Sequence, residues 1–417
     1  MRRRSLLASV GASIAGSIAG CLGDDASIAE PGPLEGRHQW GYDARNSNDA
    51  AGLAGPTDEP SQQALYTEMG GVPLTDDGIL YTSTAAIGFD GERLWDSSPP
   101  VEGSRLAPAI YEDTVVCAGS DPELCWAIDR ADGTERWQVD LSASVAGRGL
   151  WVTVQDDNAY FATGEGVGCV DLDAREEAWQ ADLSDEYPFE MPGEWLSPAA
   201  TAEHVFTLND SYGHGEGQFL YGLDRETGTV DWTAEIEGEP WSFRPPLVGS
   251  EYAFVVSQAN DPPGTDGAEG EHQWTQIAAV DPGDGEVAWR TAVDGTSDYW
   301  ESVGGGTLFL GHGKLDGPDS PGKLSAVDTS DGTVEWTVQL DTRVVSVTAT
   351  DEMVYALDSE HVRAFDRDDG DAVWSIDLVE VLEGVDSGAD LGPSIPPLVV
   401  DDGRLFFHDG ESVAGLW

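Results

Sequence analysis

Basic residues are scarce in this chain, and lysine is the scarcest of them. Lysine and arginine together number 20 against 78 aspartate and glutamate residues, and only Lys314 and Lys323 are lysines, so the formal net charge is -58. A chain this acidic repels phosphates, which excludes general nucleic-acid binding. The 15 tryptophans and the regular alternation of apolar residues nevertheless indicate a packed core rather than disorder.

The apolar stretch near the N-terminus is too short to span a bilayer, because it covers only residues 8–19. It follows Arg2-Arg3-Arg4-Ser5-Leu6-Leu7, which matches the twin-arginine export pattern. Residues 18–21, Ile-Ala-Gly-Cys, resemble a lipobox, in which Cys21 becomes the lipidated first residue of the mature protein. A plain cleaved signal with an incidental cysteine is the alternative. A diacylglycerol on Cys21 supplies two buried chains, enough for stable anchoring.

One segment recurs through the rest of the chain, and residues 277–289 are its clearest form. In five copies a glycine follows four residues after an aspartate and a tryptophan follows eight residues after it, as expected for two strands joined by a tight turn, and a sixth copy keeps the aspartate and the tryptophan. The aspartate–tryptophan pairs are Asp129 and Trp137, Asp171 and Trp179, Asp224 and Trp232, Asp281 and Trp289, Asp328 and Trp336, and Asp366 and Trp374. Arg175 replaces the glycine in one copy, and residues 90–95 form a shortened copy.

The copy at residues 221–232 resembles most closely the PQQ-like, quinoprotein-type β-propeller repeat, and the likeness covers about residues 38–417. The resemblance implies an all-β propeller of four-stranded antiparallel blades. It implies no particular activity, because this fold carries unrelated functions. We interpret the repeated tryptophans as core residues between neighbouring blades, each burying roughly 200 Å².

The two ends of the chain determine the number of blades. Seven blades follow in line, beginning near Leu65, Leu106, Leu150, Leu196, Pro245, Ser302 and Val344, and residues 396–416 supply three strands of another. Residues 37–42 form an orphan segment around Trp40. Pairing that segment with the C-terminal strands removes an open sheet edge. We therefore predict eight blades closed by the N-terminal strand, with seven blades as the alternative.

These features divide the chain into three parts. We expect residues 1–21 to be a twin-arginine lipoprotein signal, 22–36 a tether and 37–417 the propeller. The protein is then exported and anchored to the outer face of the cell membrane through Cys21. The acidity and the lack of lysine are typical of the proteins of extreme halophiles, which points to a haloarchaeal source.

Three cysteines remain beyond Cys21. Cys117 and Cys125 flank a predicted turn, and export favours a disulfide between them, although a cross-strand bridge is strained and both thiols can equally stay free. Cys169 occupies the small-residue position that alanine takes in other copies, so we expect a buried free thiol.

Catalysis by a quinoprotein is the enzymatic alternative. Enzymes of that type, which this repeat resembles, pair PQQ with adjacent cysteines and hold Ca²⁺ through a carboxylate and amide cluster. This chain has no Cys-Cys dipeptide, and the repeated aspartates occupy turns. We therefore predict no catalytic residue and no cofactor, and keep a PQQ-dependent or other redox enzyme as the alternative function.

The irregular parts of the repeats predict a binding face. Insertions fall in the loops between the second and third strands at residues 210–217, 258–274 and 312–322, and long connections between blades reach the same face. Aromatic residues in these loops suit recognition of a protein or a sugar. They are Tyr187, Phe189, Trp195, Tyr212, Trp241, Phe243, Trp274, Tyr299 and Trp300.

Three histidines, His214, His272 and His312, lie in the three inserted loops amid acidic residues. They are weak candidates for a transition-metal site, because their spacing matches no diagnostic ligand pattern. Hydrated polar loops are the alternative interpretation.

The sequence as a whole predicts a non-catalytic, monomeric scaffold that binds a surface protein or a glycan. By architecture it also resembles the lipoprotein of bacterial outer-membrane barrel assembly, an eight-bladed propeller of this repeat. That resemblance concerns the fold, and an archaeal cell has no such outer membrane, so the assembly role is not carried over.

The charge predicts that the fold loosens when salt is removed. At molar salt the Debye length is about 3 Å, so repulsion among carboxylates is screened, whereas in dilute buffer it acts across the whole surface. Thermal unfolding followed from molar salt to dilute buffer should show a falling Tm. An unchanged Tm would refute the prediction.

Overall fold

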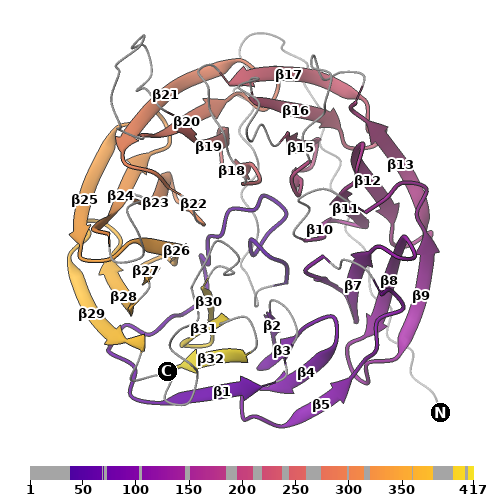
Figure 1. The fold of residues 1–417 in the computed structure, drawn as a ribbon, viewed down its shortest axis with the longest axis horizontal. Coiled ribbons are helices and arrows are strands. Elements are labelled where there is room, and N and C mark those ends of the chain that lie inside the picture. Colours follow the sequence, from indigo (N-terminus) through magenta and orange to yellow (C-terminus); the bar gives the residue numbers. More distant parts are fainter. Residues whose placement is uncertain are drawn as a thin grey trace, which may run out of the picture.

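Thirty-two strands in eight four-stranded sheets make up the described part of the chain. Figure 1 shows the sheets arranged as blades around a common axis, which confirms the predicted eight-bladed, all-β propeller. The computed structural model describes residues 38–67, 69, 73–102, 106–145, 151–184, 195–209, 218–236, 244–259, 274–297, 300–313, 320–358, 360–378, 398–408 and 412–417. Within these ranges there is no helix long and apolar enough to cross a membrane.

The blades follow one another along the chain, and each is an antiparallel sheet with its strands in sequence order. Blade 1 contains β2 (Leu74–Asp76), β3 (Ile79–Tyr81), β4 (Ala85–Gly88) and β5 (Arg93–Asp96). Blade 2 contains β6 (Ala109–Tyr111), β7 (Thr114–Gly119), β8 (Leu124–Asp129) and β9 (Glu135–Asp140). Blade 3 contains β10 (Thr153–Gln155), β11 (Asn158–Ala162), β12 (Gly166–Asp171) and β13 (Glu176–Asp182). Blade 4 contains β14 (Ala199–Ala200), β15 (His204–Leu208), β16 (Gln218–Asp224) and β17 (Val230–Ile236).

The same order continues through the second half of the ring. Blade 5 contains β18 (Leu247–Val248), β19 (Ala253–Ala259), β20 (Trp274–Val280) and β21 (Val287–Asp294). Blade 6 contains β22 (Ser302–Gly304), β23 (Thr307–Gly313), β24 (Gly322–Asp328) and β25 (Val334–Leu340). Blade 7 contains β26 (Val344–Ala349), β27 (Met353–Asp358), β28 (His361–Asp366) and β29 (Ala372–Asp377). Blade 8 combines β30 (Val399–Asp401), β31 (Arg404–His408) and β32 (Ser412–Leu416) with β1 (Gln63–Thr67).

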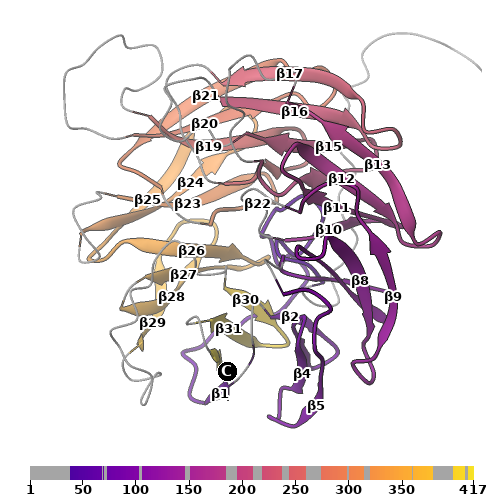
Figure 2. The same ribbon diagram turned by 45° about the vertical axis from the view of Figure 1, so that its right-hand side comes forward.

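In each blade the first strand lies nearest the axis and the fourth forms the outer rim, as Figure 1 and the turned view in Figure 2 both show. The turns between the first two strands and between the last two strands share one end of the ring. We call this end the turn face. The second strand ends and the third strand begins at the other end, as at Leu208 and Gln218 in blade 4. We call this end the loop face.

The repeated segment forms the third strand, the turn and the fourth strand of a blade. Its glycine adopts a left-handed conformation that an L-residue rarely takes, with φ of 75° at Gly285 and 76° at Gly332. Arg175, which replaces the glycine in blade 3, has φ of 58° and keeps the same turn.

In blades 2, 4, 5, 6 and 7 the turn glycine receives the tryptophan of the preceding blade. A Cβ placed on Gly285 would lie 2.6 Å from the Trp232 ring, so only glycine permits this contact. The Trp232 indole N–H also donates to Pro282 O at 3.0 Å, and the Trp289 N–H donates to Thr329 O at 3.0 Å. This contact, repeated around the ring, joins neighbouring blades.

The core lies between the blades. Apolar side chains from the facing sides of adjacent sheets form separate clusters, such as the one that Leu208 and Ile236 of blade 4 make with Val255 of blade 5. Alternate residues of the short strands point to opposite faces of each sheet, so every blade contributes to two clusters.

Blade 8 closes the ring because β1 pairs with β32, from Gln63 with Leu416 to Thr67 with Ser412. The prediction that residues 37–42 supply the closing strand is therefore wrong, and so is the start of the first blade near Leu65. Tyr42, Asn46 and Asn48 all have positive φ, which an extended strand cannot contain. Trp40 consequently lies at the ring axis and not in blade 8.

The predicted Cys117–Cys125 disulfide is also wrong. All three described cysteines, these two and Cys169, are free and buried. In the β7–β8 ladder Cys117 is opposite Trp126 and Cys125 is opposite Ala118, so the two thiols point to opposite faces of the sheet. Cys117 packs towards blade 1, whereas Cys125 packs towards blade 3, where burial raises its pKa to about 12.

The contact between tryptophan and turn glycine predicts a measurable difference between two glycines with the same backbone. Gly285 and Gly78 both have φ of 75°, but a Cβ on Gly78 would meet no atom within 4 Å. Gly78→Ala should cost only the left-handed strain of roughly 1–2 kcal/mol. Gly285→Ala should cost about 1–3 kcal/mol more, because the methyl group collides with Trp232.

Chemical denaturation of both variants at molar salt measures this difference. Equal losses of unfolding free energy would show that the tryptophan contact between blades does not constrain the fold.

Candidate functional site

The centre of the ring is filled by residues 38–50, which we call the axial segment. The innermost strand of every blade has an unpaired edge that faces the axis, and its buried N–H and C=O groups need partners. Figure 1 shows the axial segment inside the ring in indigo. Corresponding positions on the eight inner strands are Thr75, Ile110, Val154, Ala200, Val248, Val303, Ala349 and Val400, each paired with the second strand one residue before the turn.

Backbone carbonyls of the axial segment accept four of the N–H groups at these positions. Ile110 donates to His38 O at 2.6 Å and Ala200 donates to Ala44 O at 2.6 Å. Val248 donates to Arg45 O at 2.9 Å, and Val303 donates to Ser47 O at 2.7 Å. The axial segment therefore pairs directly with blades 2, 4, 5 and 6.

The remaining four blades are reached by side chains or by a backbone N–H. The Gln39 amide accepts from Val154 N at 2.8 Å and donates to Val154 O at 3.1 Å, and the Tyr42 hydroxyl accepts from Val400 N. Ala50 N donates to Ala349 O at 2.7 Å. The His38 ring lies 3.0 Å from the Asp76 carboxylate of β2. The axial segment thus contacts the inner strand of all eight blades.

Asparagines hold the sharp bends of the axial segment. The Asn46 side-chain amide donates to Pro198 O at 3.2 Å and to Pro246 O at 3.3 Å. Its side-chain oxygen accepts from Trp151 Nε1 at 3.0 Å. Its side chain consequently links blades 3, 4 and 5. Asn48 donates to Glu301 O at 3.2 Å and to Val347 O, beside blades 6 and 7.

Three tryptophans meet at the axis. The Trp40 ring stacks on Trp151 with centroids 4.9 Å apart and an interplanar angle of 8°. Trp300 approaches both edge-on, at 5.2 Å from Trp40 and 5.7 Å from Trp151. Trp40 and Trp151 are 6% and 2% exposed, so this cluster is part of the core at the axis.

The axial segment also carries two carboxylates with raised pKa values. Burial raises the pKa of Asp43 to about 6, although its carboxylate accepts from Arg45 N at 3.0 Å and Ser47 N at 3.2 Å. Burial also raises the pKa of Asp49 to about 7. The Arg367 guanidinium, 3.6 Å away, lowers this pKa only in part, and the negative charges of Asp43 and Asp351 raise it further.

The structure describes three of the aromatic residues that were predicted to form an exposed binding face. Trp195 is fully buried, bridges to Asn209 and lies 5.3 Å from the Tyr221 ring, so its predicted exposure is wrong. Trp274 is partly buried as the first residue of β20, and Trp300 belongs to the axial tryptophan cluster. Tyr187, Phe189, Tyr212, Trp241, Phe243 and Tyr299 lie outside the described residues.

The predicted role of His312 as a loop ligand for a metal is wrong. His312 lies in β23 and is buried, and its ring nitrogens are 2.8 Å from Asp294 O and 2.8 Å from Ser325 Oγ. Burial lowers its pKa to about 4. His214 and His272 lie outside the described residues, within which no cluster of metal-ligating side chains occurs.

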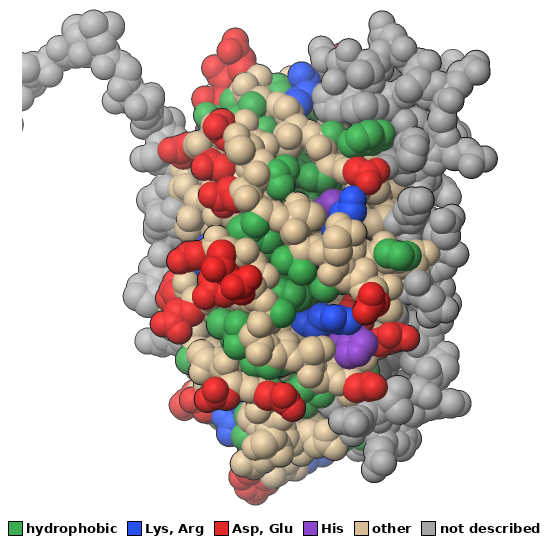
Figure 3. All heavy atoms as spheres, turned by 90° about the vertical axis from the view of Figure 1, so that its left-hand side faces the viewer, with side chains coloured by type: hydrophobic (Ala, Val, Ile, Leu, Met, Phe, Trp, Pro, Cys, Tyr) green, Lys and Arg blue, Asp and Glu red, His purple; other side chains and the backbone are tan. Residues whose placement is uncertain are grey.

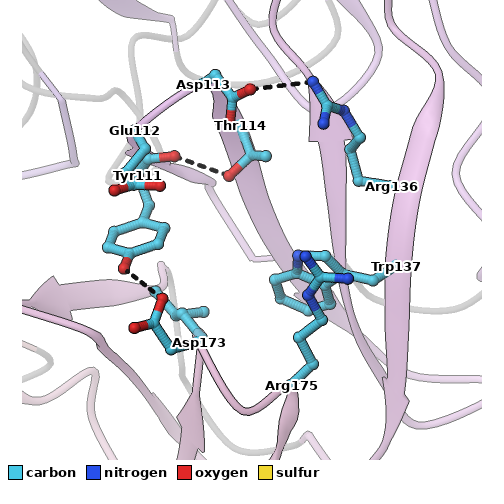
Figure 4. A pocket seen from close by; sticks show the side chains of 9 residues that line it. Tyr111, Glu112, Asp113, Thr114, Arg136, Trp137, Asp173 and Arg175 are labelled. Atoms are coloured by element: carbon cyan, nitrogen blue, oxygen red, sulfur yellow. Dashed lines mark hydrogen bonds and ion pairs between the residues drawn. The ribbon is translucent and has the colours of Figure 1, made fainter.

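A recess between blades 2 and 3, which we call the seam pocket, opens at the turn face and has a volume of about 200 Å³. The first turn of blade 2, its outer strand β9 and the last turn of blade 3 form its walls, as Figure 4 shows. The lining residues are Tyr111, Glu112, Asp113, Thr114, Arg136, Trp137, Leu172, Asp173 and Arg175.

The missing glycine in blade 3 accounts for this recess. In five other blades a Cβ on the turn glycine would lie between 2.4 Å and 2.8 Å from the preceding tryptophan ring. Arg175 has such a Cβ, so Trp137 cannot dock as the other tryptophans do. Within the described residues the Trp137 indole N–H has no acceptor, whereas the Trp95 N–H donates to Arg130 O at 2.8 Å. Arg175 was visible in the sequence as a departure from the repeat, but its consequence was not predicted.

The two arginines of the seam pocket differ in their ion pairs. Arg136 pairs with Asp113 at 3.0 Å and also with Asp129. Arg175 is exposed and has no carboxylate partner in the described part of the chain. The Tyr111 hydroxyl donates to Asp157 at 2.7 Å and lies 3.3 Å from Asp173. Burial, followed by the bond to Asp157, raises the pKa of Tyr111, so this hydroxyl stays protonated.

Comparison with known proteins identifies relatives in both sequence and fold. The profile of the family described as outer membrane protein assembly factor BamB matches residues 76–175, 163–278 and 275–416. The outer membrane protein assembly factor BamB of Yersinia pestis is 25% identical over 215 residues, which span 47% of this chain and 50% of that protein. The chain thus matches about half of the length of this relative.

Two solved structures share the fold. The quinohemoprotein alcohol dehydrogenase of Comamonas testosteroni has a TM-score of 0.63 at 13% identity, covering 92% of this chain and 81% of that one. BamB of Moraxella catarrhalis has a TM-score of 0.51 at 15% identity, covering 86% of this chain and 96% of that one. At these identities the likeness concerns the fold alone.

The carboxylates of the axial segment predict how stability depends on pH. The ordinary pKa of an aspartate is 3.8, against about 6 for Asp43 and about 7 for Asp49 in the folded protein. The folded state therefore binds more protons than the unfolded state between about pH 4 and pH 7, so the free energy of unfolding should fall as pH rises through this window.

Thermal unfolding at molar salt between these pH values measures the effect. Asp49→Asn should flatten the decline of Tm with pH, and Asp58→Asn, at an exposed position, should leave it unchanged. A decline that is equally steep in Asp49→Asn and in the unaltered protein would contradict the assignment.

Proposed function

Because this chain belongs to the family described as outer membrane protein assembly factor BamB, we propose that it is a non-catalytic scaffold that binds a protein or a glycan at the cell surface. One observation carries this proposal. The axial segment fills the ring centre and pairs with every blade, so binding is left to the outer surfaces of the molecule.

The contents of the axis disfavour the enzymatic alternative. A flat, anionic cofactor such as PQQ would need an open space at the ring centre and cations beside its carboxylates. Residues 38–50 occupy that space, and they bring Asp43 and Asp49 into it. The residues present therefore do not fit this cofactor.

The surface charge supports a protein that works in concentrated salt. Figure 3 shows one side of the molecule, on which acidic side chains form clusters and basic ones are scattered. The location we propose is the outer face of the cell membrane of a haloarchaeon, reached by twin-arginine export. Lipid on Cys21 would anchor the protein and residues 22–36 would tether a monomeric propeller to the membrane.

Assembly of outer membrane proteins is what the name of the Yersinia relative states about that protein. Our proposal takes from the family only the use of a closed propeller as a rigid platform. The loop face is the binding surface we favour, because rigid scaffolds commonly carry recognition on their longer connections.

Photo-crosslinking at molar salt tests the proposal on the intact protein. Glu235 and Glu226 are exposed glutamates at opposite ends of the hairpin of blade 4, so each can carry a crosslinking side chain in an otherwise equal setting. We expect Glu235, near the loop face, to crosslink a defined envelope protein or glycan and Glu226, on the turn face, to crosslink far less of it. Equal labelling, or labelling from Glu226 alone, would contradict the loop-face assignment.

The alternative is tested with the same preparation. Adding PQQ and Ca²⁺ should leave its visible absorbance equal to the sum of the components and should support no reduction of an electron-accepting dye with alcohols. Turnover in that assay would overturn the non-catalytic proposal.

A further inference from the structure

We propose that the seam pocket binds one neutral, hydroxyl-rich saccharide unit of a glycan. The inference rests on the proposed binding function and deepens it, because it names the ligand class and a site on the turn face. Arg175 keeps Trp137 from docking on blade 3, and polar groups surround the exposed part of this ring.

Trp137 differs from the other repeat tryptophans in the hydrogen bonding of its indole N–H. The indole N–H groups of Trp179, Trp232, Trp289 and Trp336 all donate to a carbonyl of the next blade. Trp137 has no such acceptor in the described part of the chain, although its ring packs on the core between blades 2 and 3. It therefore lines the pocket as a packed aromatic ring whose N–H has no acceptor among the described residues.

Donors and acceptors are arranged around this ring. Arg175 lies beside Trp137 in Figure 4, and its guanidinium has no carboxylate partner in the described residues. Across the pocket the Asp173 carboxylate lies 3.3 Å from the Tyr111 hydroxyl, which donates to Asp157. A sugar ring presents C–H groups that suit the negatively charged face of an aromatic ring. Its hydroxyls can accept from Arg175 and donate to Asp173 at the same time.

The lining argues against other ligands. Glu112, Asp113 and Asp173 bring three carboxylates to the pocket against two guanidinium groups, and Asp113 already pairs with Arg136. An anionic group would meet net repulsion there. An apolar side chain of a partner protein would pack on Trp137 but would gain little other apolar contact, because the aliphatic residue of the lining, Leu172, is only 3% exposed.

The size of the pocket limits the ligand to one unit. Sites for drug-sized molecules measure about 300–1,000 Å³, whereas this pocket measures about 200 Å³. A single sugar ring with its hydroxyls matches this scale, and the rest of a glycan would extend into solvent at the turn face.

Binding of simple glycosides to the whole protein at molar salt tests the inference. The probes are the methyl glycosides of glucose, galactose, mannose and N-acetylglucosamine, with methyl glucuronide as the anionic comparison. Saturation-transfer NMR detects binding and calorimetric titration measures affinity. At least one neutral glycoside should bind, and it should bind more tightly than the glucuronide.

Two variants change the pocket in different ways. Trp137→Ala removes the ring, and Arg175→Gly restores the turn residue of the other blades, which lets Trp137 dock and closes the recess. Both should weaken glycoside binding at least tenfold, about 1.4 kcal/mol or more. Arg175→Gly should keep or raise the Tm, because glycine adopts a left-handed conformation without strain. Arg93→Ala, which removes an exposed arginine of blade 1, should leave binding unchanged.

The outcomes separate this inference from the proposed function. Absence of binding by every neutral glycoside, preference for the glucuronide, or equal binding by Arg175→Gly would overturn the pocket assignment. Crosslinking of a partner through Glu235 would still support the scaffold in each of these cases. A failure of that crosslinking with glycoside binding retained would contradict the loop-face proposal and leave the seam pocket standing.

Discussion

The unpaired inner edges of eight sheets are the constraint on which this structure depends. A propeller blade pairs its strands with one another, but its first strand always turns one edge to the axis, where water is limited and backbone groups must find partners. Here residues 38–50 provide those partners. The positive φ at Tyr42, Asn46 and Asn48 lets this short segment bend from one blade to the next instead of forming a strand.

The same N-terminal part of the chain fills the axis and closes the ring. Residues beyond the axial segment run out to the rim, where Pro56 O accepts from the Trp374 indole at 3.1 Å and β1 then pairs with β32. The N-terminal part of the chain thereby fastens both the inside and the outside of the ring. Because residues 38–50 occupy the centre of the ring, the proposed scaffold role assigns recognition to the outer surfaces of the propeller.

One repeated contact also explains the most distinctive site. In blades 2, 4, 5, 6 and 7 glycine occupies the turn and the preceding tryptophan docks against it. Arg175 keeps the backbone of the turn but has a side chain, so Trp137 is displaced from its carbonyl partner and a recess remains. A change in one residue thus converts a structural contact into a surface with an aromatic ring, a cation and carboxylates.

Spacing alone was sufficient to predict the blades, because aspartate, turn glycine and tryptophan at fixed separations specify a hairpin through local backbone preferences. The sequence by itself therefore determined the repeat, the eight sheets and closure by the N-terminal part. Only the tertiary structure decided that β1 and not the segment around Trp40 closes the ring, that Cys117 and Cys125 face opposite ways, and that His312 is buried. These outcomes depend on which residues meet across the axis or through a sheet, and such contacts join parts of the chain that no local pattern connects.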